Sequence, residues 1–286
     1  MNPNEATLVW VDEYSRMAEA YDRIVVPRFE PIARMTVEVA RPKPNEAVLD
    51  VGTGTGLLAC LLAPLVAPQS VVAIDLADEA LAVASHRAGN AGLRNIRFEM
   101  MDARNIVYRG GIFDAVVSNL GIPNLGYDRT FLEARRLLRA GGRFVFSEWD
   151  AKLPEGFAAF RQLIEKHGTP SPSRSLAQVR EARALVRSDP DANALVNPRE
   201  VTERLHDLGF ARVEVVSRTF TARFADVREF IAFEAAWGWN ERELQEMSPD
   251  ARDAFEGELA DRLSKGRDAP GLEETWPIHF YFARPE

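Results

Sequence analysis

The sequence is poor in cysteine, in histidine and in long apolar runs, and each shortage excludes a class of protein. One cysteine, Cys60, and four histidines among 286 residues exclude an intrachain disulfide framework and cysteine-rich zinc sites, so we expect no metal centre. No apolar run reaches the roughly 18 residues of a membrane span, and no basic segment precedes an apolar block at the N-terminus. We therefore expect a cytoplasmic protein with no membrane partner, and a packed core position for Cys60.

Basic residues are also in the minority. The formal net charge is −8, with 46% hydrophobic and 27% charged residues, which is the composition of an ordinary globular protein. Nucleic-acid binding through phosphates needs clustered lysine and arginine, and no long basic run is present, so we expect no nucleic-acid partner. The length allows one large core, or one core with a smaller appended region.

Glycine is concentrated in the segment that organises the chain, residues 47–56, which read Ala-Val-Leu-Asp-Val-Gly-Thr-Gly-Thr-Gly. An apolar run that leads through three alternate glycines into an apolar helical stretch predicts a buried parallel strand, a tight turn and a helix N-terminus. Glycine in such a turn allows positive φ and a close approach of ligand to backbone. The unpaired N–H groups and the dipole of the following helix favour an anionic group.

The spacing of these glycines distinguishes two classes of cofactor. The dinucleotide fingerprint G-x-G-x-x-G requires a third glycine where Leu57 stands. The chain instead has G-x-G-x-G, with Asp50 two residues before Gly52. This D-x-G-x-G-x-G pattern resembles motif I of the class I S-adenosylmethionine-dependent methyltransferases. An NAD-dependent oxidoreductase remains the alternative on fold alone.

Short apolar runs alternate with helical stretches through the first half of the chain, which predicts an α/β fold with a doubly wound, mostly parallel, Rossmann-like sheet. The five predicted strands are Ala47–Val51, Ser70–Asp75, Ile96–Met100, Phe113–Ser118 and Arg143–Glu148. Phe210–Phe220 and Ile278–Ala283 bring the total to seven. The resemblance implies that the last strand inserts antiparallel, as one strand of a hairpin.

The same pattern predicts four parts of the chain. Residues 1–40 form an N-terminal helical lid and residues 41–150 the cofactor-binding Rossmann-like core. Residues 151–196 form a helical insertion or cap, and residues 197–286 complete the sheet, with further cap helices at 226–265. Within the lid we expect prolines to break the helical pattern, so that a second helix runs over Ile32–Ala40. Helix N-caps are predicted at Asp78, Asn197 and Asp226.

Ligands of an open parallel sheet bind beyond the carboxyl ends of its strands. Asp75 closes the second strand, where an acid can accept hydrogen bonds from two ribose hydroxyls, and Asp102 and Asn119 follow the third and fourth strands. This set resembles the class I methyltransferases over about Leu8–Trp149, and more closely the small-molecule branch that includes quinone C-methyltransferases. The resemblance implies S-adenosyl-L-methionine as the cofactor, with S-adenosylhomocysteine as its product.

The resemblance also assigns a role to each cofactor residue. Asp75 would bind the ribose, Asp102 the adenine amine, and Leu76 and Ala103 would flank the adenine. The glycine loop would pass beneath the methionine portion, and Asn119 would lie near its amino-acid end. The full predicted set is Tyr21 on the lid helix, Asp50, Gly52, Thr53, Gly54, Gly56, Asp75, Leu76, Asp102, Ala103 and Asn119.

Methyl transfer requires alignment and exclusion of water, and it needs a base only if the nucleophile must lose a proton. Glu148, Asp150 and His279 are weak candidate bases. A solvated carboxylate is the favoured account of Glu148 and an ordinary strand residue that of His279, so no catalytic residue is assigned. An aromatic set could hold an apolar or aromatic acceptor, although core packing also accounts for it. The candidate contacts are Trp149, Phe233 and Trp237, with Phe230 and Trp239 nearby.

Three functions follow in order. The first is methylation of a small molecule at oxygen, nitrogen or carbon. The second is methylation of RNA or protein, which the sequence disfavours because Ser118-Asn119-Leu120-Gly121 stands where such enzymes carry N-P-P-Y. The third is a cofactor-binding protein that has lost catalysis. Both a monomer and a homodimer fit the sequence.

Overall fold

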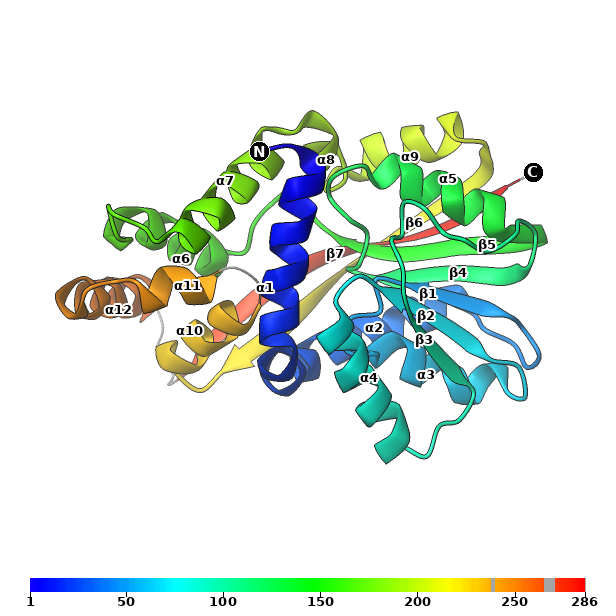
Figure 1. Ribbon diagram of the computed structural model, residues 1–286, viewed down its shortest axis with the longest axis horizontal. Helices are drawn as coiled ribbons and strands as arrows, with labels where there is room; N and C mark the ends of the chain where they lie inside the picture. Colours follow the sequence, from blue (N-terminus) through cyan, green and yellow to red (C-terminus); the bar gives the residue numbers. More distant parts are fainter. Residues whose placement is uncertain (238–239, 265–270, 286) are drawn as a thin grey trace. The chain divides into compact units, whose positions relative to one another are not determined.

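A computed structural model describes residues 1–237, 240–264 and 271–285, and the chain divides into two compact units (Figure 1). The sheet unit comprises Phe29–Ala151, Val186–Arg218 and Pro277–Glu286. The helical unit comprises Met1–Arg28, Lys152–Leu185 and Thr219–Trp276. The predicted functions of residues 1–40 as a lid and of residues 151–196 as a cap stay predictions.

Within the described residues the sheet has seven strands, in the order β3-β2-β1-β4-β5-β7-β6. Strands β1 to β5 pair in parallel, and β7 pairs antiparallel with β5. This confirms the predicted fold class and the antiparallel last strand. The strands are β1 (Val48–Val51), β2 (Val71–Asp75), β3 (Ile96–Met100), β4 (Phe113–Asn119), β5 (Leu138–Trp149), β6 (Phe210–Phe224) and β7 (Leu272–Pro285).

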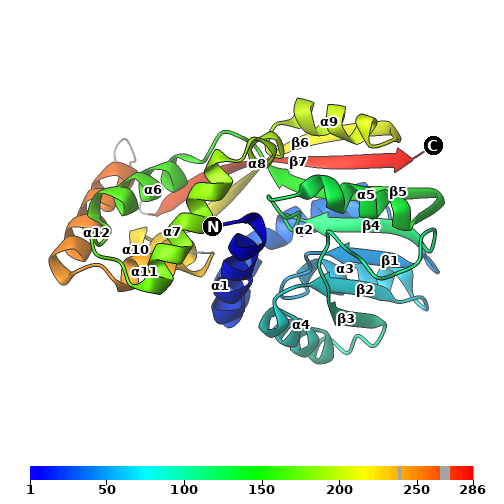
Figure 2. The same cartoon turned by 45° about the horizontal axis from the view of Figure 1, so that its top comes forward.

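Helices cover both faces of the sheet unit, so its central strands are apolar throughout. One face packs on α2 (Val26–Ala40) and α3 (Leu57–Val66), and the other on α5 (Tyr127–Leu137) and α9 (Pro198–Asp207), as both ribbon views show (Figures 1 and 2). The unit also contains α4 (Asp78–Asn90) and α8 (Pro190–Ala194). All four residues of β1 are buried. The buried strands thus bring their carboxyl ends to one edge of the sheet.

Three local predictions were wrong. The helix that follows β2 has its N-cap at Ala77 rather than Asp78. Strand β5 begins at Leu138, before the predicted Arg143, because Leu138 pairs with Phe113 ahead of a register shift. Pro31 lies inside α2 and does not end a helix.

The break near the first proline falls at Val25, between α1 (Pro3–Ile24) and α2. Pro27 lies in the first turn of α2, where a missing N–H leaves no hydrogen bond unmade. The N-caps at Asn197 and Asp226 are confirmed, since their side chains accept hydrogen bonds from the N–H groups of Arg199 and Glu229.

The helical unit has an aromatic core. Trp276, Phe233 and Phe230 are fully buried, and the ring of Phe157 stacks on the two phenylalanines and lies tilted against Trp276. Its helices are α1, α6 (Glu155–His167), most of α7 (Arg174–Ser188), α10 (Val227–Ala236), α11 (Asn240–Gln245) and α12 (Pro249–Ser264). Trp239, and Lys265 at the predicted end of the cap helices, lie outside the described residues.

Among the helices described, none is long and apolar enough to cross a membrane. Within the same residues, no group of three or more histidine, cysteine, aspartate or glutamate side chains is placed to hold a metal ion. Cys60 lies half-buried on α3 rather than fully inside the core.

Candidate functional site

The three glycines after β1 all adopt positive φ, but they serve different ends. A Cβ atom on Gly52 would lie 2.3 Å from the carbonyl oxygen of Gly121, and one on Gly56 would lie 2.8 Å from the Cβ of Ala84. At Gly54 a Cβ would meet no described atom within 4 Å. Gly52 and Gly56 are therefore required for packing within the protein. Gly54 is the glycine whose backbone is open to a ligand.

Asp50 is hydrogen-bonded to the glycine loop. It is fully buried at the end of β1, and its Oδ2 accepts a hydrogen bond from Thr53 Oγ1 at 2.7 Å. Its Oδ1 is buried and has no hydrogen-bond partner among the described residues. Burial raises the pKa of Asp50 to about 7, and the charge of Asp75 adds to the rise, while the bond from Thr53 opposes it.

Asp75 closes β2 and is held by main-chain donors. Its Oδ2 accepts from Gly54 N at 2.8 Å and its Oδ1 from Ala77 N at 3.0 Å. Burial raises the pKa of Asp75, against the lowering effect of these N–H groups. A carboxylate has about four lone-pair sites, so both oxygens can still accept from a ligand. The bond to Gly54 joins the predicted ribose acid directly to the open part of the loop.

Asp102 leaves the neighbouring strand at the same edge of the sheet, since Met101 N donates to Asp75 O at 2.9 Å. Its carboxylate receives Nε and Nη2 of Arg104 at 3.0 and 2.8 Å. Burial alone would raise the pKa of Asp102, but the Arg104 bonds outweigh it and hold the pKa below its ordinary value. Sequence patterns gave no sign of Arg104. Leu76 and Ala103, beside the two acids, are half-buried.

Asn119 at the end of β4 is fixed by two hydroxyl groups. Thr36 Oγ1 and Ser147 Oγ donate to its Oδ1 at 2.9 and 3.1 Å. The amide –NH2 is what remains for a ligand. The next residue, Leu120, has φ of 55°, a left-handed conformation that is rare outside glycine and collects at functional sites. Gly121 then reaches Gly52, so the loops after β1 and β4 meet backbone to backbone.

The end of β5 carries the weaker catalytic candidates. Glu148 lies opposite His279 in the β5–β7 register, and both are buried. Burial raises the pKa of Glu148 to about 8, against a hydrogen bond from Trp149 N, so Glu148 is protonated at neutral pH. His279 bonds to Asp150 through Nε2 and to Ser217 through Nδ1, each at 2.8 Å. The structure thus brings His279 and Asp150 together and adds Ser217, which the sequence did not signal.

The remaining predicted residues lie on other packing surfaces. Trp149 makes an edge-to-face contact with Phe29, with ring centroids 5.9 Å apart. Tyr21 lies on α1 in the helical unit, and its contact with the cofactor stays a prediction. Phe233 is fully buried there, and Trp237 is half-buried with its ring 4.9 Å from Phe157. These contacts are those of a core, and a role in acceptor binding also stays a prediction.

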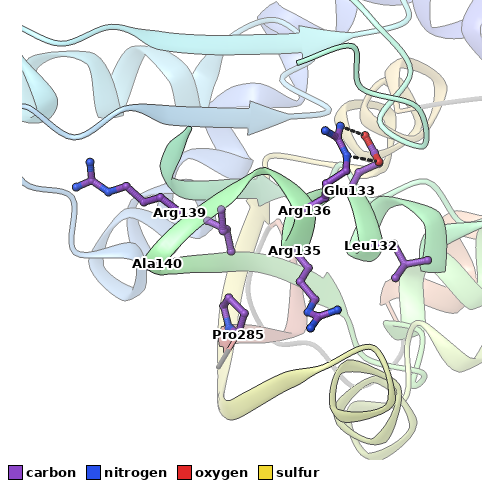
Figure 3. Close-up of a pocket in the computed structure, with 8 residues that line it drawn as sticks. Leu132, Glu133, Arg135, Arg136, Arg139, Ala140 and Pro285 are labelled. Atoms are coloured by element: carbon purple, nitrogen blue, oxygen red, sulfur yellow. Dashed lines mark hydrogen bonds and ion pairs between the residues drawn. The ribbon is translucent and has the colours of Figure 1, made fainter. Parts of the chain in front are cut away.

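A pocket of about 540 Å³ opens at the other end of the sheet, near the amino ends of β4 and β5 (Figure 3). Its arginines are partly committed, since Arg136 pairs with Glu133, as the dashed lines in Figure 3 show, and Arg139 pairs with Asp114. The lining residues are Leu132, Glu133, Arg135, Arg136, Leu138, Arg139, Ala140 and Pro285. This pocket lies away from the glycine loop and is not the candidate site.

Comparisons with known proteins agree with this geometry. Residues 48–142 match a family model described as "Methyltransferase domain". Nocamycin O-methyltransferase of Saccharothrix syringae is 26% identical, over 95% of this chain and 96% of that protein. A ubiquinone/menaquinone biosynthesis C-methyltransferase of Zymomonas mobilis is 26% identical, over 74% of this chain and 88% of that protein. The fold is shared with the YcgJ protein of Bacillus subtilis, with a TM-score of 0.58, 17% identity, and coverage of 89% of this chain and 98% of that one.

Residues 48–142 therefore match a methyltransferase domain, and the fold, the glycine loop and the relatives make the chain similar to the class I S-adenosylmethionine-dependent methyltransferases. Within this class it is similar to the small-molecule branch that includes quinone C-methyltransferases. The methyltransferase interpretation is therefore favoured over an NAD-dependent oxidoreductase.

Proposed function

We propose that the sheet unit binds S-adenosylmethionine across the carboxyl ends of β1, β2, β3 and β4 and delivers its methyl group to a small apolar or aromatic acceptor. The observation that carries the proposal is the pairing of Gly54 with Asp75. Gly54 has open space above its Cα, and its N–H donates to the acid that ends the next strand. A ligand can thus approach the loop backbone and the carboxylate at one place.

The chemistry of the strand-end groups suits this cofactor. S-adenosylmethionine presents hydrogen-bond donors in its ammonium, its ribose hydroxyls and its adenine amine, and the strand ends present carboxyl acceptors in Asp50, Asp75 and Asp102. A dinucleotide would place an anionic pyrophosphate beside the same acids, and like charges repel at this range. The carboxyl acceptors at the strand ends support a cationic ligand over a dinucleotide.

The bound cofactor supplies an activated methyl group on sulfur, so the chain mainly has to bind and align. Asp75 would hold the ribose, and Asp102 the adenine amine between Leu76 and Ala103. The Gly52–Gly121 contact would fix the loop beneath the methionine portion. Asn119, with its amide oxygen held by Thr36 and Ser147, would present its –NH2 to the carboxylate.

The acceptor side rests on the aromatic residues. Trp149, in the sheet unit, is the proposed contact. Roles in acceptor binding for Phe233 and Trp237, for residues 1–40 as a lid and for residues 151–196 as a cap stay predictions from the sequence. Aromatic surfaces suit an apolar or aromatic molecule. The acidic composition and the lack of basic runs support an acceptor other than nucleic acid, and a cytoplasmic enzyme without a membrane partner.

Calorimetric titration of the purified protein with S-adenosylhomocysteine, and separately with NAD, tests the cofactor. We expect S-adenosylhomocysteine to bind and Asp75→Ala to weaken binding at least about tenfold, because charge-assisted hydrogen bonds are lost. The matched control is Asp207→Ala, an exposed acid of the same unit on α9. Binding of NAD without binding of S-adenosylhomocysteine overturns the proposal.

Transfer of a labelled methyl group tests the acceptor class. The protein is incubated with methyl-labelled S-adenosylmethionine and either naphthols and hydroxynaphthoquinones or total RNA. We expect label in the small aromatic molecules. Label in RNA alone contradicts the proposed acceptor class while leaving cofactor binding intact.

A further inference from the structure

Three polar side chains form a hydrogen-bonded series across the end of the sheet, one from each of β6, β7 and the residue after β5. Asp150 Oδ2 lies 2.8 Å from His279 Nε2, and His279 Nδ1 lies 2.8 Å from Ser217 Oγ. His279 is buried, Asp150 is half-buried and Ser217 is exposed. The series runs from a buried imidazole to a hydroxyl that solvent reaches.

The carboxylate sets the direction of one of these bonds. A carboxylate can only accept, so Nε2 of the imidazole carries a proton that points to Asp150. In a neutral imidazole Nδ1 is then an acceptor, and it receives the hydroxyl proton of Ser217. The lone pairs of Ser217 Oγ are left for a further donor. An O–H group placed against Ser217 therefore meets an acceptor that is itself in contact with a base.

The other titratable groups on this face do not compete for a proton. Glu148 lies opposite His279 in the register, and Tyr281 is two residues further along β7, stacked on Phe146 at 4.5 Å. Burial raises the pKa of both groups, that of Glu148 to about 8, and for Tyr281 the charges of Glu148 and Asp150 add to the rise. Both keep their protons at neutral pH. His279, with Asp150 beside it, is the base on this face.

The series also lies at the carboxyl edge that holds the cofactor residues. Ser147 contacts Asn119 of β4, and Asp150 follows it by three residues along the same strand end. Neighbouring strands are about 4.8 Å apart, so β7 lies about 14 Å from β1 and β6, which carries Ser217, lies about 19 Å from it. An acceptor that contacts Ser217 would therefore extend over β5 and β7 from a cofactor that covers β1 and β4.

We propose that Ser217, His279 and Asp150 form a proton relay for an acceptor hydroxyl, and that the chain is consequently an O-methyltransferase. This inference rests on the proposed function and adds the atom that is methylated. Ser217 is the member that touches the acceptor. His279 and Asp150 act through it, the first as base and the second by fixing the imidazole and balancing its charge.

The step is balanced as follows. The acceptor oxygen forms its new bond to the methyl carbon with its own electron pair, while the pair of the S–CH3 bond stays on sulfur. The acceptor O–H proton passes to Ser217 Oγ as the Ser217 proton passes to His279 Nδ1. The imidazolium is neutralised by Asp150 and later loses its proton to solvent. A general base of this kind contributes about 10²–10⁴-fold to the rate.

The relay geometry is tested without cofactor or acceptor. NMR of ¹⁵N-histidine-labelled protein reports the tautomer of each imidazole, and His279→Asn assigns the His279 signals. We expect the Nε2–H tautomer at neutral pH, shifted in Asp150→Asn and Ser217→Ala and unchanged in Ser217→Thr. A mixture of tautomers, or His279 signals that stay unchanged in both Asp150→Asn and Ser217→Ala, overturns the proposal.

The function of the relay is tested with two acceptors of one shape. Naphthol must lose its proton during transfer, whereas naphthalenethiol is largely ionised at pH 8. With saturating S-adenosylmethionine we expect His279→Asn to lower kcat for naphthol about 100-fold and for naphthalenethiol less than about threefold. Ser217→Ala should follow the same pattern and Ser217→Thr should restore the rate.

His206→Asn is the matched control, since His206 lies in the same unit with Nδ1 against Phe210 O and away from the relay. Equal losses on both acceptors, no loss on naphthol, or no methylation of naphthol by the unmodified protein contradicts the relay. Calorimetry with S-adenosylhomocysteine is run on each variant. Retained binding shows that the failure belongs to the relay and not to the proposed cofactor site.

Discussion

Two pairs of buried acids, one pair in each unit, are held in different ways. In the helical unit, Glu13 lies against Arg16 and Arg242, and Glu243 lies against Arg180 and Arg183. In the sheet unit, Asp50 and Asp75, near the ends of β1 and β2, are held by hydroxyl and main-chain N–H donors.

The difference separates structural acids from acids that can serve a ligand. A guanidinium is a fixed charge that takes up part of the acceptor capacity of a carboxylate and balances its charge, whereas N–H dipoles orient a carboxylate and leave its charge for a ligand. We therefore expect substitutions of the first kind to lower stability, and substitutions of the second kind to lower ligand affinity. The following predictions test that separation, from the largest effect on stability to the smallest.

Gly52→Ala should have the largest effect. The new Cβ would lie 2.3 Å from Gly121 O, in a residue with φ of 66°. Overlap with backbone adds to left-handed strain, and together they should cost about 4 kcal/mol or more of unfolding free energy. Thermal and urea unfolding measure it. Gly54→Ala, with the same strain and open space, should cost only about 1 kcal/mol yet weaken S-adenosylhomocysteine binding, and equal losses of stability would contradict this account.

Glu243→Ala should come next, because it leaves Arg180 and Arg183 without their carboxylate. Removing one partner of a buried ion pair costs about 3 kcal/mol. Urea unfolding measures the loss, and calorimetry should show unchanged affinity for S-adenosylhomocysteine. A large fall in that affinity would break the separation between the two kinds of acid. Glu203→Ala, which removes an exposed pair with Arg199, is the control and should cost less than about 0.5 kcal/mol.

Glu234 is an exception within the helical unit and predicts a pH effect. Its Oε1 has no hydrogen-bond partner in the described chain, and burial, with the charge of Glu274, raises its pKa from 4.5 to about 8. The folded protein then binds more protons than the unfolded chain between these values, so stability should fall as pH rises through them. Glu234→Gln should remove roughly 2 kcal/mol of the fall between pH 5 and 8. Urea unfolding at both pH values gives the slope, and an unchanged slope would refute the assignment.

Asp75→Asn should have the smallest effect on stability, about 1 kcal/mol or less, because an amide oxygen can keep one N–H bond. Its effect on S-adenosylhomocysteine affinity should be about tenfold or more. Asp102→Asn should weaken affinity less, about threefold, because Arg104 already shares that carboxylate. Calorimetry on both variants makes the comparison, and the reverse order would show that Arg104 moves away when ligand binds.

The strand ends were predictable because the chain marks them locally. Each of the first four strands is a short run with a polar residue at or just after its end: Asp50, Asp75, Asp102 and Asn119. The hydrophobic periodicity and the turn residues are enough to find such runs. The predicted strand boundaries were wrong where the boundary depends on a contact with a residue distant in sequence. Leu138 joins β5 because Phe113 is beside it, which no pattern around Leu138 records.

The groups that complete the candidate site were hidden for the same reason. Thr36, Ser147 and Arg104 matter through their hydrogen bonds to Asn119 and Asp102. A single serine or threonine on a helix or strand has no distinctive neighbours in sequence. Ser217 is likewise one polar residue on an alternating strand, and it meets His279 only because β6 lies beside β7. Only Gly121, two residues after Asn119, carried a signal, since a glycine after a strand marks a close approach of backbone.

The division of the chain also limits how this protein can be taken apart. The boundary between the units runs through β6, between Arg218 and Thr219, and through β7, between Trp276 and Pro277. Each unit is assembled from three separate stretches of polypeptide, so no stop codon and no single proteolytic nick yields one of them whole. A gene fragment that ends before β6 would encode the cofactor loop but omit the inserted strand that borders β5. Expression trials should accordingly use the entire reading frame.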